Sequence, residues 1–474
     1  MTQRRDFQPI HGFRDDALGD HDGVGIMELI RKKEVKVEEV LEAAMQRCQV
    51  VDPQLNAVQL TCFDQARDKA QDGRGLTFGG LPTFVKDNID VKGLPTNYGS
   101  AAFKASPAKS YDPFVDQFLS LGFNPIGKSR LPEFGFNAST EFVDDPPCRN
   151  PWNLDYSAGG SSGGAAALVA AGVVPIAHAN DGGGSIRIPA SHCGLVGLKP
   201  SRYRLLKSRS SEVAVVDIIS QGVVSRSVRD TAYFLHGAEV FAPSKKFAPV
   251  GLVKHPGKRR LKVGILLESV TGHETCSETR KTVELTAQTL EELGHTIVEA
   301  TSPVGEDFVD DFSTYWGMLS FVVANIGKVR ISSDFDKSRL DQFTRGLSAD
   351  FRKRVYAMPK ILYRLKRSWH AYAKAFKKFD LLLCPVLNHK VPELGYLSPK
   401  IGFEELFGRL EKYAGFTPLQ NASGGPAIAL PMGQSKEGLP IGIQLAALHG
   451  QERRLLEVAY ELEEARPFRR IQDA

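Results

Sequence analysis

The residues with the clearest chemical potential form one short run, Asp181-Gly182-Gly183-Gly184-Ser185-Ile186-Arg187. Three consecutive glycines permit positive φ angles and leave backbone N–H groups uncovered, and such a run can form a nest that binds an anion. A serine at its end has its hydroxyl beside donors suited to a tetrahedral oxyanion. The run equally suits a tight turn between buried elements, because glycine clusters often mark turns. Taken alone, it favours neither interpretation.

A nucleophilic serine requires a base, and no histidine of this sequence has a recognisable partner. Lys86 is a second candidate, because it follows the apolar Phe84 and Val85 in a segment that suits a short strand. Burial lowers the pKa of a lysine and can keep its amine neutral. A surface lysine near Asp87, with its stem covering apolar neighbours, fits the same pattern. Lys86 therefore needs support from other parts of the chain.

Two short motifs suggest other chemistry. Residues 122–129 match the phosphate-loop pattern G-x4-G-K-S, but the preceding segment has helical spacing and the loop would contain the apolar Phe123 and Ile126. We therefore do not expect ATP binding. Residues 159–163 match the G-x-S-x-G turn of Ser-His-Asp esterases, which needs a strand directly before it. Residues 153–158 are polar and suit a loop, so such an esterase remains a secondary hypothesis.

Taken together, three motifs resemble the amidase signature family. They are Lys86 in Val-Lys-Asp-Asn, Ser161 in Gly-Gly-Ser-Ser-Gly-Gly, and Ser185 in Asp-Gly-Gly-Gly-Ser-Ile-Arg. Their separations, 161 − 86 = 75 and 185 − 161 = 24 residues, are similar to those of members such as fatty acid amide hydrolase. The flanking sequences also resemble those of the family over most of the chain, including residues 149–153, 193–200 and 416–444.

The resemblance implies a serine hydrolase that works without histidine. Ser185 would be the nucleophile, and Ser161, joined to Gly160 by a cis peptide bond, would relay the proton. Lys86 in its neutral form would be the base. The implied reaction is hydrolysis of a carboxylic acid amide through an acyl-enzyme on Ser185, with the proton returned to the leaving amine.

The resemblance also assigns roles to residues around the nucleophile. The backbone N–H groups of Gly182, Gly183, Gly184 and Ser185 would form the oxyanion hole. Asp181 and Arg187 would brace the loop, and Ser162 would support the relay. No metal and no cofactor is implied.

The chain differs from the usual family sequence at Asn180, where many members have Thr, and at Gly182. Residues 177–185 look similar to a subgroup that includes 6-aminohexanoate-cyclic-dimer hydrolase, which hints at linear or cyclic amides of medium size. Two alternatives remain: a glutamine-hydrolysing A-type subunit of a tRNA amidotransferase, and a catalytically idle scaffold on the same fold.

The elements that must position these residues alternate along the chain. Helical spacing over about 23–50 is followed by strand candidates at 56–62 and 84–86, a helix at 114–121 and an Ala-rich helix at 163–171. Strands and helices then alternate through 261–267, 282–293, 296–300, 380–384, 427–431, 441–445 and 451–465. This order predicts an α/β class. The resemblance implies a large mixed twisted sheet with helices on both faces, in a single domain over 1–474 with its signature region at about 80–200.

Composition limits the partners. Sixty Lys and Arg against 55 Asp and Glu give a net charge of +5 over 474 residues, too weak a bias for a nucleic-acid binder. We expect a small-molecule amide as the partner and no nucleic acid, and a homodimer stays open because the family includes monomers and dimers. Six dispersed cysteines without a C-x-x-C pair and no apolar leader predict a cytoplasmic protein.

One segment raises the question of a membrane. Residues 360–378 are rich in Lys and Arg, and Leu362, Leu365, Trp369, Tyr372 and Phe376 share one helical stripe. Such stripes usually face a protein core, so we expect a helix docked on the core, interrupted near Pro359, rather than membrane association.

Overall fold

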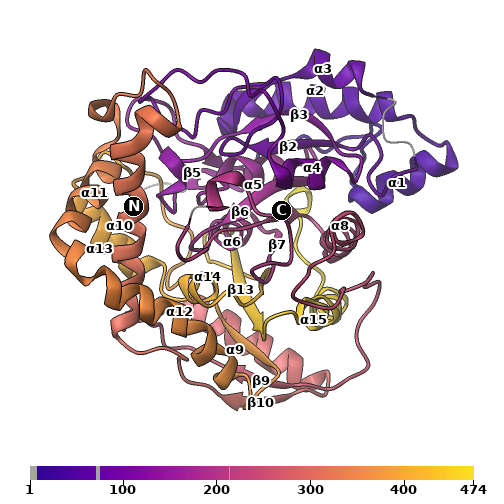
Figure 1. Cartoon of the computed structure of the whole chain (residues 1–474). Helices are drawn as coiled ribbons and strands as arrows, with labels where there is room; N and C mark the ends of the chain where they lie inside the picture. Colours follow the sequence, from indigo (N-terminus) through magenta and orange to yellow (C-terminus); the bar gives the residue numbers. More distant parts are fainter. Residues whose placement is uncertain (1–7, 71–74, 213) are drawn as a thin grey trace, which may run out of the picture.

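The centre of the molecule is an eight-stranded mixed sheet with the order β10-β9-β11-β13-β12-β7-β8-β6 (Figure 1). The computed structural model describes residues 8–70, 75–212 and 214–474. Strand β9 pairs in parallel with β10 and β11, and the other neighbours are antiparallel. The strands are β6 (Ile176–Asp181), β7 (Val196–Lys199), β8 (Ser220–Ser225), β9 (Lys262–Ile265), β10 (Thr296–Glu299), β11 (Leu381–Pro385), β12 (Ala427–Gln434) and β13 (Pro440–Ala447).

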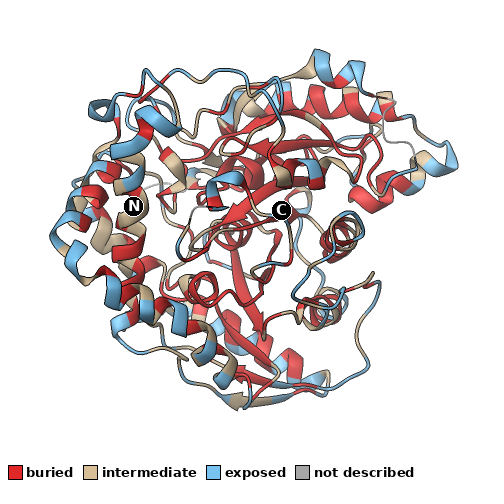
Figure 2. Cartoon of the chain, in the orientation of Figure 1, coloured by how far each residue is buried: buried red, intermediate tan, exposed pale blue. Residues whose placement is uncertain are grey.

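Helices cover both faces of this sheet, as predicted. Alternate residues of a strand point to opposite faces: Leu381 and Leu383 pack in one buried cluster, and Leu382 and Cys384 pack in another. Figure 2 shows the buried centre between two partly exposed helical layers. The first cluster contains α8 (Val228–Phe241), α9 (Ser277–Glu292) and α15 (Glu452–Ala465); the second contains α10 (Asp307–Arg330), α12 (Met358–Ala375) and α14 (Pro418–Ser423).

A smaller sheet, β1-β3-β2, brings Lys86 to the edge of the large one. Its strands are β1 (Val58–Thr61), β2 (Pro82–Lys86) and β3 (Asn124–Ser129). The helices α1 (Gly23–Lys32), α2 (Val37–Leu55), α3 (Phe63–Asp68) and α4 (Pro113–Leu119) lie in the same part of the molecule. Strand β2 lies beside β6, because Thr83 Oγ1 donates to the Ile176 carbonyl at 2.9 Å and the Lys86 N–H donates to His178 Nδ1 at 3.2 Å.

Two elements carry the serines to the same place. The expected loop at 153–158 is wrong: residues 153–157 form β5 (Asn153–Ser157), which pairs with β4 (Arg149–Asn150) through main-chain hydrogen bonds that do not require apolar side chains. Ser161 and Ser162 follow β5 and precede α5 (Gly163–Ala170), while Ser185 follows β6 and precedes α6 (Arg187–Cys193). Helices α5 and α6 pack together, so both serines lie at one site.

Most of the basic segment 360–378 lies in one helix, α12 (Met358–Ala375), and the expected interruption near Pro359 separates it from the preceding helix. Helix α11 (Gln342–Arg354) ends in the 3-10 turn Val355–Ala357, and α12 then begins with Pro359 in its first turn, where a proline lacks no helical hydrogen bond. Leu365 and Tyr372 are buried in the core, so the docked helix is confirmed. Among the described residues, none of the helices has the length and apolar character needed to cross a bilayer. The remaining helices are α7 (Arg209–Glu212) and α13 (Phe403–Tyr413), and further 3-10 turns cover Glu133–Gly135, Lys337–Arg339 and Ile471–Asp473.

Candidate active site

Lys86 is fully buried at the end of β2, and its amine contacts three neutral side chains. Nζ lies 2.8 Å from Ser161 Oγ, 2.9 Å from Ser162 Oγ and 2.7 Å from Asn180 Oδ1. Asn180 is in β6, so the contact between β2 and β6 creates this cluster. The surface interpretation of Lys86 is therefore wrong.

Burial controls the charge of this lysine. Removal from water lowers the pKa of Lys86 from 10.5 to about 7, and the negative charge of Asp181 opposes that shift only in part. Since none of the three groups in contact with Nζ carries a charge, the amine loses its proton close to neutral pH. Neutral lysine is the form that can accept a proton.

Ser161 stands beside this amine in a constrained turn. The Gly160–Ser161 peptide bond is cis, as the sequence resemblance implied. A Cβ at Gly160 would lie 2.8 Å from the backbone of Ala138 and Ser139, so only glycine fits this close approach. The Ser162 N–H donates to the Ser185 carbonyl at 3.3 Å and ties the turn to the second serine.

The Asp181 carboxylate organises the loop of the second serine. It accepts from the Gly184 N–H at 2.7 Å and from the Ile186 N–H at 3.1 Å. The Gly184 N–H, one of the four donors expected for the oxyanion hole, is therefore already donated to a carboxylate. For the N–H groups of Gly182, Gly183 and Ser185, the described part of the chain provides no acceptor.

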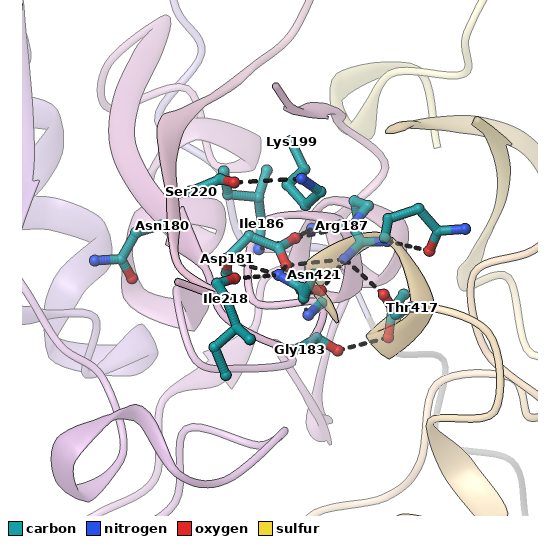
Figure 3. Close-up of polar contacts among 12 residues, drawn as sticks. Asn180, Asp181, Gly183, Ile186, Arg187, Lys199, Ile218, Ser220, Thr417 and Asn421 are labelled. Carbon is teal, nitrogen blue, oxygen red and sulfur yellow. Dashed lines mark hydrogen bonds and ion pairs between the residues drawn. The ribbon is translucent and has the colours of Figure 1, made fainter. Parts of the chain in front are cut away.

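Gly184 has a conformational role instead. Its φ of +129° is accessible almost only to glycine, and a Cβ there would lie 2.5 Å from Thr417 Oγ1. Thr417 also donates to the Gly183 carbonyl at 2.6 Å (Figure 3). The loop is thereby held against the start of α14.

Arg187 and Asp181 form a fully buried ion pair under this loop (Figure 3). Arg187 Nε and Nη2 each lie 2.9 Å from a carboxylate oxygen of Asp181, and the guanidinium holds the pKa of Asp181 well below its usual range. Asn421 Nδ2 donates to the Asp181 carboxylate at 2.9 Å and to the Ile218 carbonyl at 2.9 Å. A buried pair with these further hydrogen bonds gives a rigid support.

A cavity of about 180 Å³ opens over the two candidate serines, Ser161 and Ser185. Ser161, Ser185, Asn180, Gly182 and Gly183 line its polar end. Most of the remaining wall is apolar and comes from the 134–138 loop, from 218–219, and from one face of α10 that carries Phe308, Val309, Phe312, Trp316 and Leu319. This arrangement suits a substrate with an apolar body and one reactive polar group.

Comparisons with known proteins agree with this geometry. A family model described as Amidase matches residues 39–456. The chain belongs to the amidase family. A putative amidase AmiC from Mycobacterium leprae is 45% identical over 466 residues, which cover 98% of this chain and 99% of that protein. A 6-aminohexanoate-cyclic-dimer hydrolase from Paenarthrobacter ureafaciens is 34% identical, with 94% and 95% covered.

A solved structure of a 6-aminohexanoate cyclic dimer hydrolase complexed with substrate superposes with a TM-score of 0.87 at 31% identity, covering 96% of this chain and 99% of that one. The predicted fold, a large mixed sheet flanked by helices, is therefore that of the amidase signature enzymes. The resemblance to the subgroup named in the sequence analysis is confirmed.

The two rival motifs have other roles in this amidase. Residues 127–129 of the phosphate-loop match lie within β3, where Lys128 forms a buried ion pair with Asp87 at 2.6 Å. The buried His178 is held between the Lys86 N–H and Gln221, and burial lowers its pKa to about 3. His192 contacts the Ser157 carbonyl and the Tyr413 hydroxyl, so neither imidazole approaches a candidate nucleophile.

Sequence reasoning missed two contributions to the site. Asn180 was noted only as a difference from the family sequence. Its side chain accepts a hydrogen bond from the Lys86 amine and contacts Asn88 through two hydrogen bonds of 3.2 and 3.0 Å. The partners of Arg187 in α14 and β13, Gln420 and Gln444, lie more than 230 residues along the chain. The polar residue 180 beside the three-glycine run was the available signal for Asn180.

Proposed function

We propose that this amidase hydrolyses a carboxylic acid amide with Ser185 as nucleophile, Ser161 as proton relay and neutral Lys86 as base. The observation that carries the proposal is the buried Lys86 amine, 2.8 Å from Ser161 Oγ among neutral partners. Ser185 lines the same cavity as Ser161, and its carbonyl accepts from the Ser162 N–H.

A count of hydrogens supports the direction of the relay. Neutral Lys86 has two N–H groups and one lone pair. Asn180 Oδ1 is only an acceptor and takes one N–H. The Ser162 hydroxyl donates its hydrogen to the main-chain carbonyl of Asn180 at 3.3 Å, so Ser162 Oγ accepts the second N–H of Lys86. The lone pair of the Lys86 amine is then left to accept the hydroxyl hydrogen of Ser161. Ser161 Oγ can in turn accept the hydroxyl hydrogen of Ser185.

The reaction follows from this arrangement. Ser185 Oγ attacks the amide carbonyl while its proton passes to Ser161 and the proton of Ser161 passes to Lys86. The N–H groups of Gly182, Gly183 and Ser185 stabilise the oxyanion, and we leave Gly184 out of this set. The proton returns by the same route to the leaving amine, and water, deprotonated by the relay, cleaves the acyl-enzyme.

The cavity favours an apolar amide over glutamine. Free glutamine carries an ammonium and a carboxylate, and none of the described residues in the cavity wall is a Lys or Arg that could pair with a carboxylate. We therefore rank a linear or cyclic amide of medium size above the amidotransferase subunit. We further propose one domain over residues 1–474, a cytoplasmic location, and no nucleic-acid or membrane partner; a homodimer is compatible with these proposals.

A panel of aryl, aliphatic and cyclic amides tests the function, with product formation measured for the wild type and Ser185→Ala. We expect hydrolysis of at least one apolar amide by the wild type and none by the variant. Turnover that persists in Ser185→Ala would refute the nucleophile. Glutaminase activity that appears only with added partner subunits would favour the amidotransferase, and no reaction with any amide would favour the idle scaffold.

A further inference from the structure

One wall of the substrate cavity carries a charge. Among the described residues that line it, Glu411 is the only one with a carboxyl group, and none of them is a lysine, arginine or histidine. Glu411 is half-buried near the end of α13, between Leu410 and Lys412, and Leu410 lines the same wall. A charge in an apolar wall is costly unless a partner compensates it.

The protein does not supply that partner within the described ranges, where Glu411 has neither a hydrogen-bond donor nor an ion pair. The neighbouring Arg354 is bonded to Asp350 at 3.1 Å and to Asp310 at 3.7 Å. Asp310 and Asp350 both raise the pKa of Glu411, after the larger effect of burial, and Arg354 lowers it. Arg354 is therefore already paired with two other carboxylates, and Glu411 has no ion pair of its own among the described residues.

Aromatic side chains line the cavity together with Glu411. Phe407 precedes Glu411 by one helical turn on α13, so the two side chains share a face. The ring of Trp316, from α10, stacks on Phe407 with 6.4 Å between centroids, and Trp316 lines the cavity together with Phe312. A carboxylate and an indole ring that line one cavity can together bind an ammonium group, by charge and by cation–π attraction.

We propose that the substrate carries a cationic nitrogen, an ammonium or substituted ammonium group, at a distance from the scissile carbonyl, and that Glu411 and Trp316 bind it. The proposal rests on the amide hydrolysis assigned above and names its substrate class. The apolar wall would hold the connecting chain while Ser185 reacts with the carbonyl at the polar end. A bound cation would also lower the pKa of Glu411 and hold it ionised.

Matched pairs of acyl p-nitroanilides test this inference. The members of each pair have the same unbranched chain, which ends in a methyl group or in an ammonium group, and chains of several lengths are compared. We expect kcat/KM of the wild type to be about fivefold to tenfold higher for the ammonium member at the best length, and added salt to reduce this ratio.

The variants separate charge from shape. Glu411→Gln keeps the size of the side chain and should remove the preference while retaining hydrolysis of the methyl series, and Glu411→Lys should favour a carboxylate-ended chain. Glu404→Gln, an exposed position on the same helix, is the matched control and should leave the ratio unchanged.

Two results would overturn the inference, and they are distinguishable. If the methyl series is hydrolysed and Ser185 is modified by a serine probe, but the wild type shows no preference or Glu411→Gln retains it, the cation site is wrong and the proposed function stands. If no member is hydrolysed and Ser185 is not modified, the proposed function fails and the inference fails with it.

Discussion

Two buried lysines on neighbouring strands have opposite surroundings. Lys86 on β2 and Lys128 on β3 are both inaccessible to solvent, and Lys128 pairs in register with Val85, the residue before Lys86. The Lys128 amine forms an ion pair with Asp87 at 2.6 Å and also contacts the Pro95 carbonyl and Thr96 Oγ1. The Lys86 amine contacts only hydroxyl and amide groups.

Under the proposed function, the same residue type serves structure at one position and chemistry at the next. Burial lowers the pKa of Lys128 and raises the pKa of Asp87, but each partner of this ion pair opposes the shift of the other, which favours the charged pair. Neutral acceptors do not fix the charge, so Lys86 can exchange a proton near neutral pH. Lys86 and Asp87 are adjacent in the sequence, but β2 ends at Lys86 and the Asp87 carboxylate pairs with Lys128 instead.

The largest effect is expected for Lys86→Met. Loss of the base should lower kcat/KM by roughly 10²–10⁴-fold, because a positioned base contributes about that much. The midpoint of thermal unfolding should change far less than in Lys128→Met, since no buried charge is left unpaired. Steady-state kinetics and thermal melts check both, and a variant with near-normal activity would contradict the role of Lys86.

Lys128→Met should give the reverse pattern. Removing one partner of a buried ion pair leaves the Asp87 carboxylate uncompensated, so we expect a loss of about 3–5 kcal/mol in the free energy of unfolding. The specific activity of the folded fraction should fall far less than in Lys86→Met. Urea titration measures the stability, and Asp87→Leu/Lys128→Met, which removes both charges, should recover much of it; a stable single variant would show that the pair is dispensable.

Asn180→Asp should give Lys86 the surroundings of Lys128. A carboxylate in place of Asn180 Oδ1 would raise the pKa of Lys86, by about one to three units for an opposite charge at this range. The acidic limb of the kcat/KM profile should move to higher pH by the same amount. Asn124→Asp, a substitution at a buried asparagine on β3, is the control and should leave the acidic limb at the same pH. An unshifted limb in Asn180→Asp would show that this limb does not report the titration of Lys86.

The smallest predicted effect concerns the wild type. Burial lowers the pKa of Lys86 to about 7, and the active form is neutral, so kcat/KM should rise with pH through that value. Below it, activity should fall about tenfold for each pH unit, as for one titrating group. A profile that declines as pH rises through 7 would require a protonated group instead.

Ser161, Ser185 and Lys86 were named from three sequence motifs with fixed separations, and their catalytic roles stay a proposal. Most strands were located from apolar runs. Strands β6, β7 and β8 were missed; in β6, Ile-Ala-His-Ala-Asn-Asp lacks the β-branched alternation of a typical strand and is stabilised by its neighbours β8 and β2.

Contacts between distant residues could not be predicted. The Gly184 N–H donates to the Asp181 carboxylate because of the direction in which that side chain points, and no sequence motif indicates this direction. The support of Arg187 by Gln420 and Gln444 and the contact of Asn180 with Lys86 depend on the packing of separate elements. The charge of Glu411 is visible in the sequence, but its place in the cavity wall is a result of how α13 packs near α10.

The rate at which a fluorophosphonate labels the protein, followed over pH, tests the central claim most directly. We predict one adduct, located at Ser185 by peptide mass analysis. The rate at which it forms should increase as the pH rises through a midpoint near 7. Labelling should be absent in Ser185→Ala and strongly slowed in Lys86→Met. An adduct on another residue, or a rate at Ser185 that is independent of pH and of Lys86, would contradict the relay from a neutral buried lysine.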